Sequence, residues 1–245
     1  MVDGQYPPFT RAAVFGASGG IGNALVRLLQ TRGVETIYAG SRSGDVPAGE
    51  SIVPFRFDYD DPASLDAVGK LMADAPPQLV IVATGVLTLT DGTGPERSVR
   101  QIDADAMERV MRANAIGPAL IAKALLPLFD RKERSVFAAL SARVGSIGDN
   151  RIGGWHSYRA SKAALNMLVR NFAIELSRTH KHALAVSLHP GTVDTDLSRP
   201  FQSNLPEGQL TGADEAAGNL LSVIDGLGPE DSGYQFDWKG ERVPD

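Results

Sequence analysis

A glycine-rich turn between two apolar segments is the feature that most constrains the fold of this chain. Residues 11–15, RAAVF, predict a buried strand, the turn GASGGIG runs from Gly16 to Gly22, and ALVRLLQTRG predicts a helix that ends at Gly33. Strand, turn and helix make the first half of a βαβ unit. Glycines let the backbone approach a pyrophosphate, and the helix N-terminus beyond offers free N–H groups. The turn therefore predicts a dinucleotide site, with a flexible surface turn as the alternative.

The rest of the chain alternates apolar segments of strand length with amphipathic segments of helix length. This alternation predicts an α/β fold of the Rossmann type, a doubly wound and mostly parallel sheet flanked by helices on both faces. We expect a single domain over residues 1–245, because no linker-like stretch divides the chain. The predicted strands cover residues 11–15, 35–39, 51–57, 78–85, 135–140, 183–188 and 234–236. The predicted helices after Gly33 cover residues 62–73, 104–113, 115–129, 157–178 and 213–227.

The end of the second predicted strand indicates which cofactor the turn would bind. In dinucleotide folds this strand end reaches the adenosine ribose, where a carboxylate bonds the hydroxyl of NAD and an arginine accommodates the extra phosphate of NADP. Ser41 and Arg42 occupy this place, and no carboxylate does. We therefore predict NADP(H) over NAD(H). The alternative is that Arg42 is an exposed loop arginine.

A tyrosine and a lysine four residues apart, in the stretch YRASK, form the candidate catalytic pair. Tyr158 and Lys162 lie near the start of a predicted helix, so they share one of its faces. A nearby ammonium favours phenolate and is expected to lower the pKa of the tyrosine from its usual value near ~10. The pair is therefore a candidate for general acid–base catalysis. By itself, such spacing is also common on solvated helix faces.

Composition excludes several other kinds of site. The chain has no cysteine, and its four histidines lack the spacing of a metal site, so we expect no metal. The formal net charge of −5 argues against nucleic acid or an anionic membrane as a partner. Without a transmembrane-length apolar run or a signal-like N-terminus, the sequence predicts a cytoplasmic protein.

These features together resemble the short-chain dehydrogenase/reductase family over nearly the whole chain. The stretches GSIGDN, GGWHSYRASKAALN and HPGTVDTDLS are most similar to the subgroup of C-factor-like and sniffer-like carbonyl reductases. The resemblance implies that Gly16, Gly20 and Gly22 hold the pyrophosphate, and that Asp58 lies at the adenine amino group. The full cofactor set that it implies is Gly16, Ser18, Gly20, Ile21, Gly22, Ser41, Arg42, Asp58, Ala83, Gly85, Tyr158, Lys162, Pro190, Gly191, Val193 and Thr195.

The resemblance also implies an activity, the NADP(H)-dependent interconversion of a small-molecule carbonyl and an alcohol. Tyr158 would exchange the proton with the substrate oxygen, and Lys162 would bind the nicotinamide ribose and lower the tyrosine pKa. Asn114 would hold a water of the proton relay, and Ser141 would polarise the carbonyl oxygen. The rival is a dinucleotide-binding regulator of the same fold that turns over little.

The chain departs from the family pattern in three places, and two of them, the missing asparagines and the altered serine register, motivate that rival. Phe15 stands where a threonine is usual, and residues 82–85 read Val-Ala-Thr-Gly in place of Asn-Asn-Ala-Gly. The register of the family serine falls on Ala142, one residue after Ser141. A bulge at a strand end can re-aim a side chain by one position, so we favour Ser141 as the active-site serine. Ser146, which lies further along the loop, is the alternative.

Two further expectations concern a covering loop and self-association. Residues 198–212 predict a mobile loop over the substrate, with Phe201, Leu205 and Leu210 as its apolar residues. The helices 115–129 and 157–178 carry apolar residues on more than one face, which predicts a homodimer or homotetramer. The residues on which this depends are Leu120, Leu125, Leu128, Leu165, Leu168 and Phe172.

Overall fold

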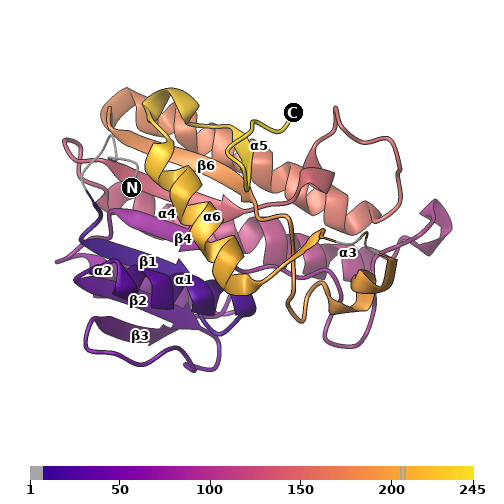
Figure 1. Ribbon diagram of the computed structural model, residues 1–245, viewed down its shortest axis with the longest axis horizontal. Coiled ribbons are helices and arrows are strands. Elements are labelled where there is room, and N and C mark those ends of the chain that lie inside the picture. The colour runs from indigo at the N-terminus through magenta and orange to yellow at the C-terminus, as the bar shows by residue number, and fades with distance from the viewer. Residues whose placement is uncertain (1–7, 205, 207) are drawn as a thin grey trace.

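A seven-stranded parallel sheet forms the centre of the computed structural model, which describes residues 8–204, 206 and 208–245 (Figure 1). The strand order is β3-β2-β1-β4-β5-β6-β9, and every neighbouring pair is parallel. The order reverses direction at β1, as a doubly wound sheet requires, so the predicted fold class is confirmed. The strands are β1 (Arg11–Phe15), β2 (Thr36–Ser41), β3 (Ile52–Arg56), β4 (Leu79–Val82), β5 (Ser135–Leu140), β6 (Ala183–His189) and β9 (Gln235–Asp237).

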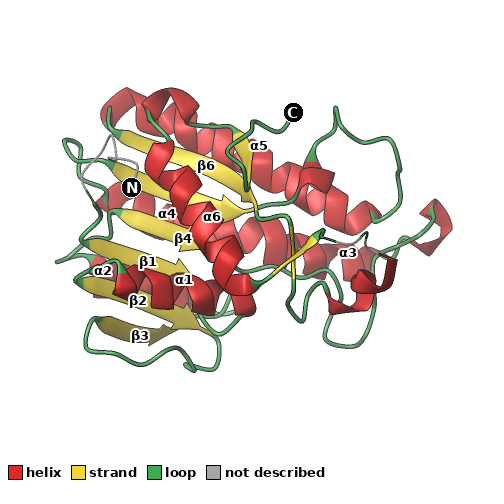
Figure 2. Cartoon of the chain, viewed as in Figure 1, coloured by secondary structure: helices red, strands yellow, loops and turns green. Residues whose placement is uncertain are grey.

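Helices cover both faces of the sheet and divide the core into two layers (Figure 2). Helices α1 (Gly20–Thr31) and α6 (Ala213–Gly226) pack on one face, and α2 (Pro62–Met72), α4 (Gly117–Leu125) and α5 (His156–Thr179) pack on the other. Along β1, Ala12 and Val14 face the first layer, whereas Ala13 and Phe15 face the second. A strand buried on both faces has to be apolar throughout, which is why RAAVF signals a central strand.

One continuous helical segment replaces the two helices predicted around Asn114. Helix α3 (Ala104–Met111) passes into a π-helical turn, η2 (Arg112–Ile116), and then into α4. Asn114 lies inside this turn and is completely buried, so it is not the helix breaker that its residue type suggested. A π-turn inserts an extra residue without ending the helix, and such turns are frequent at functional sites.

Other element boundaries agree with the prediction to within one or two residues, except at β4 and at the start of α1, which begins at Gly20 and not at residue 24. The predicted strand 78–85 ends at Val82, because residues beyond it leave the sheet and bond to side chains. Beyond β6, the chain forms the 3-10 segment η5 (Arg199–Asn204). In the predicted covering loop, β8 (Leu210–Thr211) pairs with β7 (Thr192–Val193). Leu205 lies outside the described residues, and the mobility of residues 198–212 stays a prediction.

The apolar helix residues that suggested a partner are mostly used within the chain. Leu125 and Leu165 are buried in the second core layer, and Leu120, Leu128 and Phe172 pack against it. Ile116, Met167 and Ile174 remain exposed on these helices. The homo-oligomer therefore stays a prediction. Within the described part of the chain, none of the helices is long and apolar enough to span a membrane.

Candidate active site

The predicted site residues gather where the parallel strands end, on the right-hand side of the sheet in Figure 1. Loops leaving β4, β5 and β6 meet the start of α5 around a cavity of about 340 Å³. Ligands in open α/β sheets bind at this edge. The predicted residues that line the cavity are Ile21, Ala83, Gly85, Ser141, Tyr158, Lys162, Pro190, Gly191, Val193 and Thr195.

The glycine turn is too tightly packed for larger residues. A Cβ at position 22 would lie 2.1 Å from the carbonyl oxygen of Gly16, and one at position 20 would lie 2.7 Å from Cγ2 of Thr195. Gly16 itself has φ of +88°. Helix α1 begins at Gly20 with no side-chain cap and no acidic residue in its first turn. The geometry thus fits a pyrophosphate bound by free N–H groups.

At the end of β2 lie the two residues that the sequence predicted to distinguish NADP from NAD, Ser41 and Arg42. One side chain is buried and the other is exposed. Ser41 is 1% exposed, and its Oγ accepts a 2.9 Å hydrogen bond from the Gly44 amide, so it shapes the turn. The Arg42 side chain is exposed, and Arg56 of the neighbouring strand donates from Nε to the Arg42 carbonyl at 3.1 Å. In the described structure, neither guanidinium has a carboxylate within ion-pair distance. Asp58 follows β3 and is exposed.

The tyrosine and lysine of YRASK are both buried in the first two turns of α5. The Lys162 ammonium nitrogen donates a 2.8 Å hydrogen bond to the Leu140 carbonyl and lies 5.8 Å from the Tyr158 ring centroid. Burial raises the pKa of Tyr158 to about 12 and lowers the pKa of Lys162 to about 8. The predicted lowering of the tyrosine pKa is therefore wrong, because the loss of hydration outweighs the effect of an ammonium that is bonded to the Leu140 carbonyl.

Asn114 connects the exit of β4 to the catalytic helix. Its Oδ1 accepts from the Val86 amide at 2.8 Å, and its Nδ2 donates to the Val86 carbonyl at 2.9 Å and to Ser161 Oγ at 3.0 Å. The Ser161 hydroxyl donates in turn to the Tyr158 carbonyl at 2.8 Å. A Cβ at Gly85 would meet Asn114 Oδ1 at 3.3 Å and Lys162 Nζ at 3.4 Å. Asn114 therefore lies beside the pair, and its predicted role toward a water stays a prediction.

The contacts of Asn114 also compensate for the missing asparagines after β4. In the stretch Val82–Gly85, the Thr84 hydroxyl shares a 2.6 Å hydrogen bond with the Tyr59 phenol. Together with the two bonds between Asn114 and Val86, this bond holds the segment that follows β4 in place. Phe15, the other departure, is fully buried and packs edge-on against Phe55 at 5.2 Å. At both places where the sequence departs from the family pattern, other contacts of the chain hold the backbone or fill the core.

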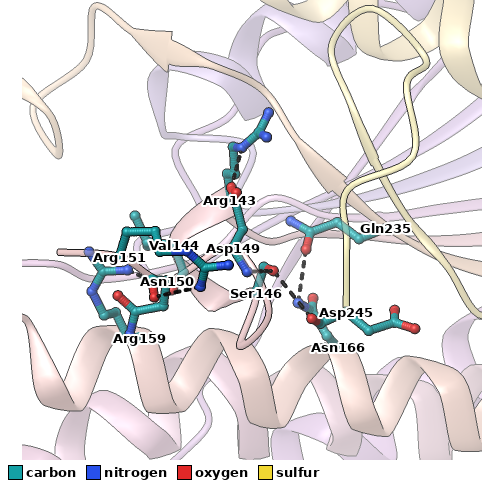
Figure 3. Close-up of polar contacts among 10 residues, drawn as sticks. All are labelled: Arg143, Val144, Ser146, Asp149, Asn150, Arg151, Arg159, Asn166, Gln235 and Asp245. Atoms are coloured by element: carbon teal, nitrogen blue, oxygen red, sulfur yellow. Dashed lines mark hydrogen bonds and ion pairs between the residues drawn. The ribbon is translucent and has the colours of Figure 1, made fainter. Parts of the chain in front are cut away.

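The two candidate serines have different surroundings. Ser141 lines the cavity, and its Oγ is buried without a hydrogen-bond partner among the described residues. Ser146 Oγ instead accepts from the Asp149 amide at 3.0 Å and donates to the Asp245 carbonyl at 3.4 Å (Figure 3). An unpaired buried hydroxyl at a cavity wall is free to bond to a bound molecule. The geometry therefore favours Ser141.

A second cavity, of about 840 Å³, adjoins the first at the Tyr158 side chain. Its walls are residues 87–110 after β4, residues 155–158 at the start of α5, and residues 200–203 of η5. Trp155 and Phe201 line both cavities, and their ring centroids lie 5.2 Å apart. This cavity is the candidate substrate site, and Phe201 lines it; the predicted covering of the substrate by residues 198–212 stays a prediction.

Four residues of this region escaped the sequence-based prediction. His189 lines the first cavity, and burial lowers its pKa to about 4, so it is neutral at neutral pH. Trp155 separates the two cavities, Arg56 lies beside Arg42, and Glu96 is 8% exposed in the wall of the larger cavity. His189 and Arg56 could have been predicted from the sequence, because each is the last residue of a strand. Glu96 could not, because it lies in an irregular stretch with no sequence pattern.

Fold and site together define an α/β protein with a dinucleotide cradle and a buried tyrosine–lysine pair. A family model described as short chain dehydrogenase matches residues 10–206. The chain belongs to this family of oxidoreductases, as the sequence resemblance predicted.

Several known proteins are similar to this chain. A 1-hydroxy-2-glutathionyl-2-methyl-3-butene dehydrogenase from Rhodococcus sp. is 34% identical over 90% of this chain and 92% of its own. The C-signal protein of Myxococcus xanthus is 39% identical over 58% of this chain and 81% of its own. The NADPH-bound carbonyl reductase from chicken fatty liver superposes with a TM-score of 0.81 at 26% identity, covering 98% of this chain and 96% of its own. Sniffer of D. melanogaster has the same fold, with a TM-score of 0.82 at 20% identity over 97% of this chain and all of its own.

Proposed function

We propose that this chain is an NADP(H)-dependent carbonyl reductase that interconverts a carbonyl and an alcohol. The observation that carries the proposal is the convergence of Ser141, Tyr158 and Lys162 on one cavity beside the glycine cradle. Bound NADPH would supply the hydride to the carbonyl carbon. The protein residues would bind the substrate oxygen and deliver its proton.

Tyr158 is the proton donor in this proposal. Its raised pKa, about 12 in the cofactor-free protein, keeps the phenol protonated at neutral pH and ready to donate during reduction. The Ser141 hydroxyl would donate a second hydrogen bond to the same oxygen, where negative charge develops as the carbonyl is reduced. Lys162 would contact the nicotinamide ribose, and an ammonium there would favour the phenolate that remains after proton transfer.

Preference for NADP(H) is supported by the two arginines at the ends of β2 and β3. Arg42 and Arg56 present guanidinium groups that are paired with no carboxylate in the described structure, and no acidic residue occupies position 41 or 42. A charge-assisted bond to a phosphate is roughly twice as strong as a neutral one. The similar chicken enzyme is described as NADPH-bound. Asp58 would contact the adenine.

The larger cavity would receive the rest of the substrate. Trp155 and Phe201 give it an aromatic wall next to Tyr158, which suits a substrate with an apolar group near its carbonyl. Residues 198–212 would cover this wall when substrate binds. The similar Rhodococcus protein is named as the dehydrogenase of a hydroxylated compound, which agrees with alcohol–carbonyl chemistry.

The experiment is NADPH oxidation with benzaldehyde, cyclohexanone and isatin, alongside NADPH binding followed by fluorescence. Turnover of any one of these carbonyls, faster with NADPH than with NADH, is the expected result. Binding of NADPH without turnover of any carbonyl or of the corresponding alcohols would support the regulator instead. The departures at residues 82–85 do not favour the regulator, since Tyr59 and Asn114 hold that segment.

A further inference from the structure

The start of the catalytic helix has an unusual backbone. Gly153, Gly154 and Trp155 have φ of +69°, +65° and +50°, and Trp155 is the one non-glycine residue with positive φ in the described chain. Such a conformation is unfavourable for a bulky residue and persists where the surroundings impose it. Trp155 also occupies the N-cap position of α5 and provides no side-chain cap. Something outside the helix must bond its first N–H groups.

Glu96 supplies those bonds from a loop 61 residues away in sequence. Its carboxylate accepts from the Ser157 amide at 3.1 Å and 3.3 Å, and it also accepts a short hydrogen bond from the Ser157 hydroxyl. Its backbone carbonyl accepts from the Trp155 amide at 2.5 Å. Side chain and main chain of one residue therefore hold both the left-handed residue and the first turn of α5.

The Glu96 side chain is held in its charged form. Burial raises the pKa of Glu96, but the hydrogen bonds from Ser157 and the backbone together outweigh burial, so the net pKa lies below the usual value. A carboxylate is therefore present at neutral pH, and a negative charge at a helix N-terminus is stabilising. The bonds are charge-assisted and largely shielded from water, which makes them strong.

The residue after Ser157 is the proposed proton donor. The Trp155 ring packs edge-on against the Tyr158 ring, with centroids 6.2 Å apart, and Glu96 lies in the wall of the cavity that Tyr158 also lines. We propose that Glu96 is a positioning residue, which holds the first turn of α5 so that the Tyr158 oxygen lies where a substrate carbonyl needs it. This inference rests on the proposed function, because it assigns Tyr158 the proton transfer.

The test compares Glu96→Ala and Glu96→Gln with the wild-type enzyme, using whichever of benzaldehyde, cyclohexanone and isatin the wild type reduces fastest. We expect Glu96→Ala to lower kcat by about 10–100-fold at saturating NADPH, since a small displacement of a catalytic group has an effect of this size. Its Kd for NADPH should stay within about twofold, and the solvent deuterium isotope effect on kcat should rise. Glu96→Gln keeps an oxygen that can accept from the Ser157 amide, so it should recover most of the rate.

A matched control loses a helix cap elsewhere. Asp61 caps α2 by accepting from the Ala63 amide at 3.0 Å, and Asp61→Ala should leave kcat and the isotope effect unchanged. Ser157→Ala removes the hydroxyl from the other side of the contact. Combined with Glu96→Ala it should lose no more than Glu96→Ala alone, because the alanine at position 96 has already removed the group that accepts from the Ser157 hydroxyl.

Three results would overturn the inference. The first is a Glu96→Ala enzyme with wild-type kcat. The second is a loss of activity matched by an equal loss of NADPH-binding sites, which would show that part of the variant protein is misfolded and that the folded part reacts normally.

The third result applies if the wild type reduces none of the three carbonyls. The proposed function itself then fails, and hydrogen exchange of the peptide 155–162 decides the role of Glu96. We expect faster exchange there in Glu96→Ala than in Asp61→Ala, and equal exchange would refute the role.

Discussion

The Lys162 ammonium donates a 2.8 Å hydrogen bond to the carbonyl oxygen of Leu140. This bond ties the catalytic helix to the end of β5, immediately before Ser141. Lys162 is 4% exposed and has no carboxylate partner in the described structure, so its charge is only partly compensated. The consequence is the lowered pKa of about 8, caused by burial.

The pH dependence of stability should show this buried lysine. The native pKa of about 8 lies below the reference value of 10.5, so between these values the unfolded chain binds a proton that the native protein does not. The charge therefore costs stability below pH 8, and that cost is lost as pH rises toward 10.5. We expect this group to raise the free energy of unfolding by about 1–3 kcal/mol between about pH 8 and 10. Urea unfolding of cofactor-free wild type and Lys162→Met over this range checks it, and parallel pH profiles for the two proteins would contradict it.

Tyr158→Phe should remove the transferable proton and little else. Within the described structure no side chain or backbone group is hydrogen-bonded to the phenol oxygen, so the variant should fold and bind NADPH normally. We expect kcat to fall by ~10²–10⁴-fold, the usual contribution of a general acid. Steady-state kinetics and NADPH titration measure the two effects separately. A variant that keeps most of its kcat would remove Tyr158 from the mechanism.

Arg42→Ala should weaken the binding of NADPH and leave the binding of NADH nearly unchanged. A charge-assisted phosphate bond contributes roughly 1.5–3 kcal/mol, which corresponds to a ~10–150-fold change in Kd. Arg56→Ala should show the same selectivity with a smaller loss, because the Arg56 Nε is already bonded to the Arg42 carbonyl. Calorimetric titration with both cofactors checks this. Equal losses for NADPH and NADH would show that these arginines do not read the phosphate.

The sequence was most informative where a residue type has one physical use. The apolar strand, the close-packed glycines and the pairing of Tyr158 with Lys162 each follow from local pattern, and the structure places them at one sheet edge. The tyrosine pKa was predicted wrongly, because spacing shows that an ammonium is near but not how deeply both groups are buried.

Contacts between segments that are distant in the sequence could not be predicted from local sequence patterns. Glu96 reaches Ser157, and Asn114 reaches Val86, only because the fold brings separate loops together. Asn114 also shows how context overrides propensity, since the predicted gap between the helices 104–113 and 115–129 is bridged by a π-turn that accommodates the asparagine.

The last prediction concerns which serine, Ser141 or Ser146, contacts the substrate oxygen. Residues next to each other on a strand face opposite ways, so a one-residue shift in register would turn the serine away if the strand continued. Here β5 ends at Leu140, the 3-10 turn η4 (Arg143–Gly145) begins three residues later, and both Ser141 and Ala142 line the cavity, so the shift is tolerated.

Paired serine variants test this assignment. We expect Ser141→Ala to lower kcat by roughly 10–10³-fold, as the loss of one donor to a developing oxyanion does. Stability should change little, because the Ser141 hydroxyl has no protein partner to lose. Ser146→Ala is the matched control: it should lower the melting temperature slightly, through its bond from the Asp149 amide, and keep kcat. Steady-state kinetics and thermal unfolding of both variants decide the matter. The reverse ranking would move the role to Ser146, and two silent variants would leave Tyr158 as the sole protein donor to the substrate oxygen.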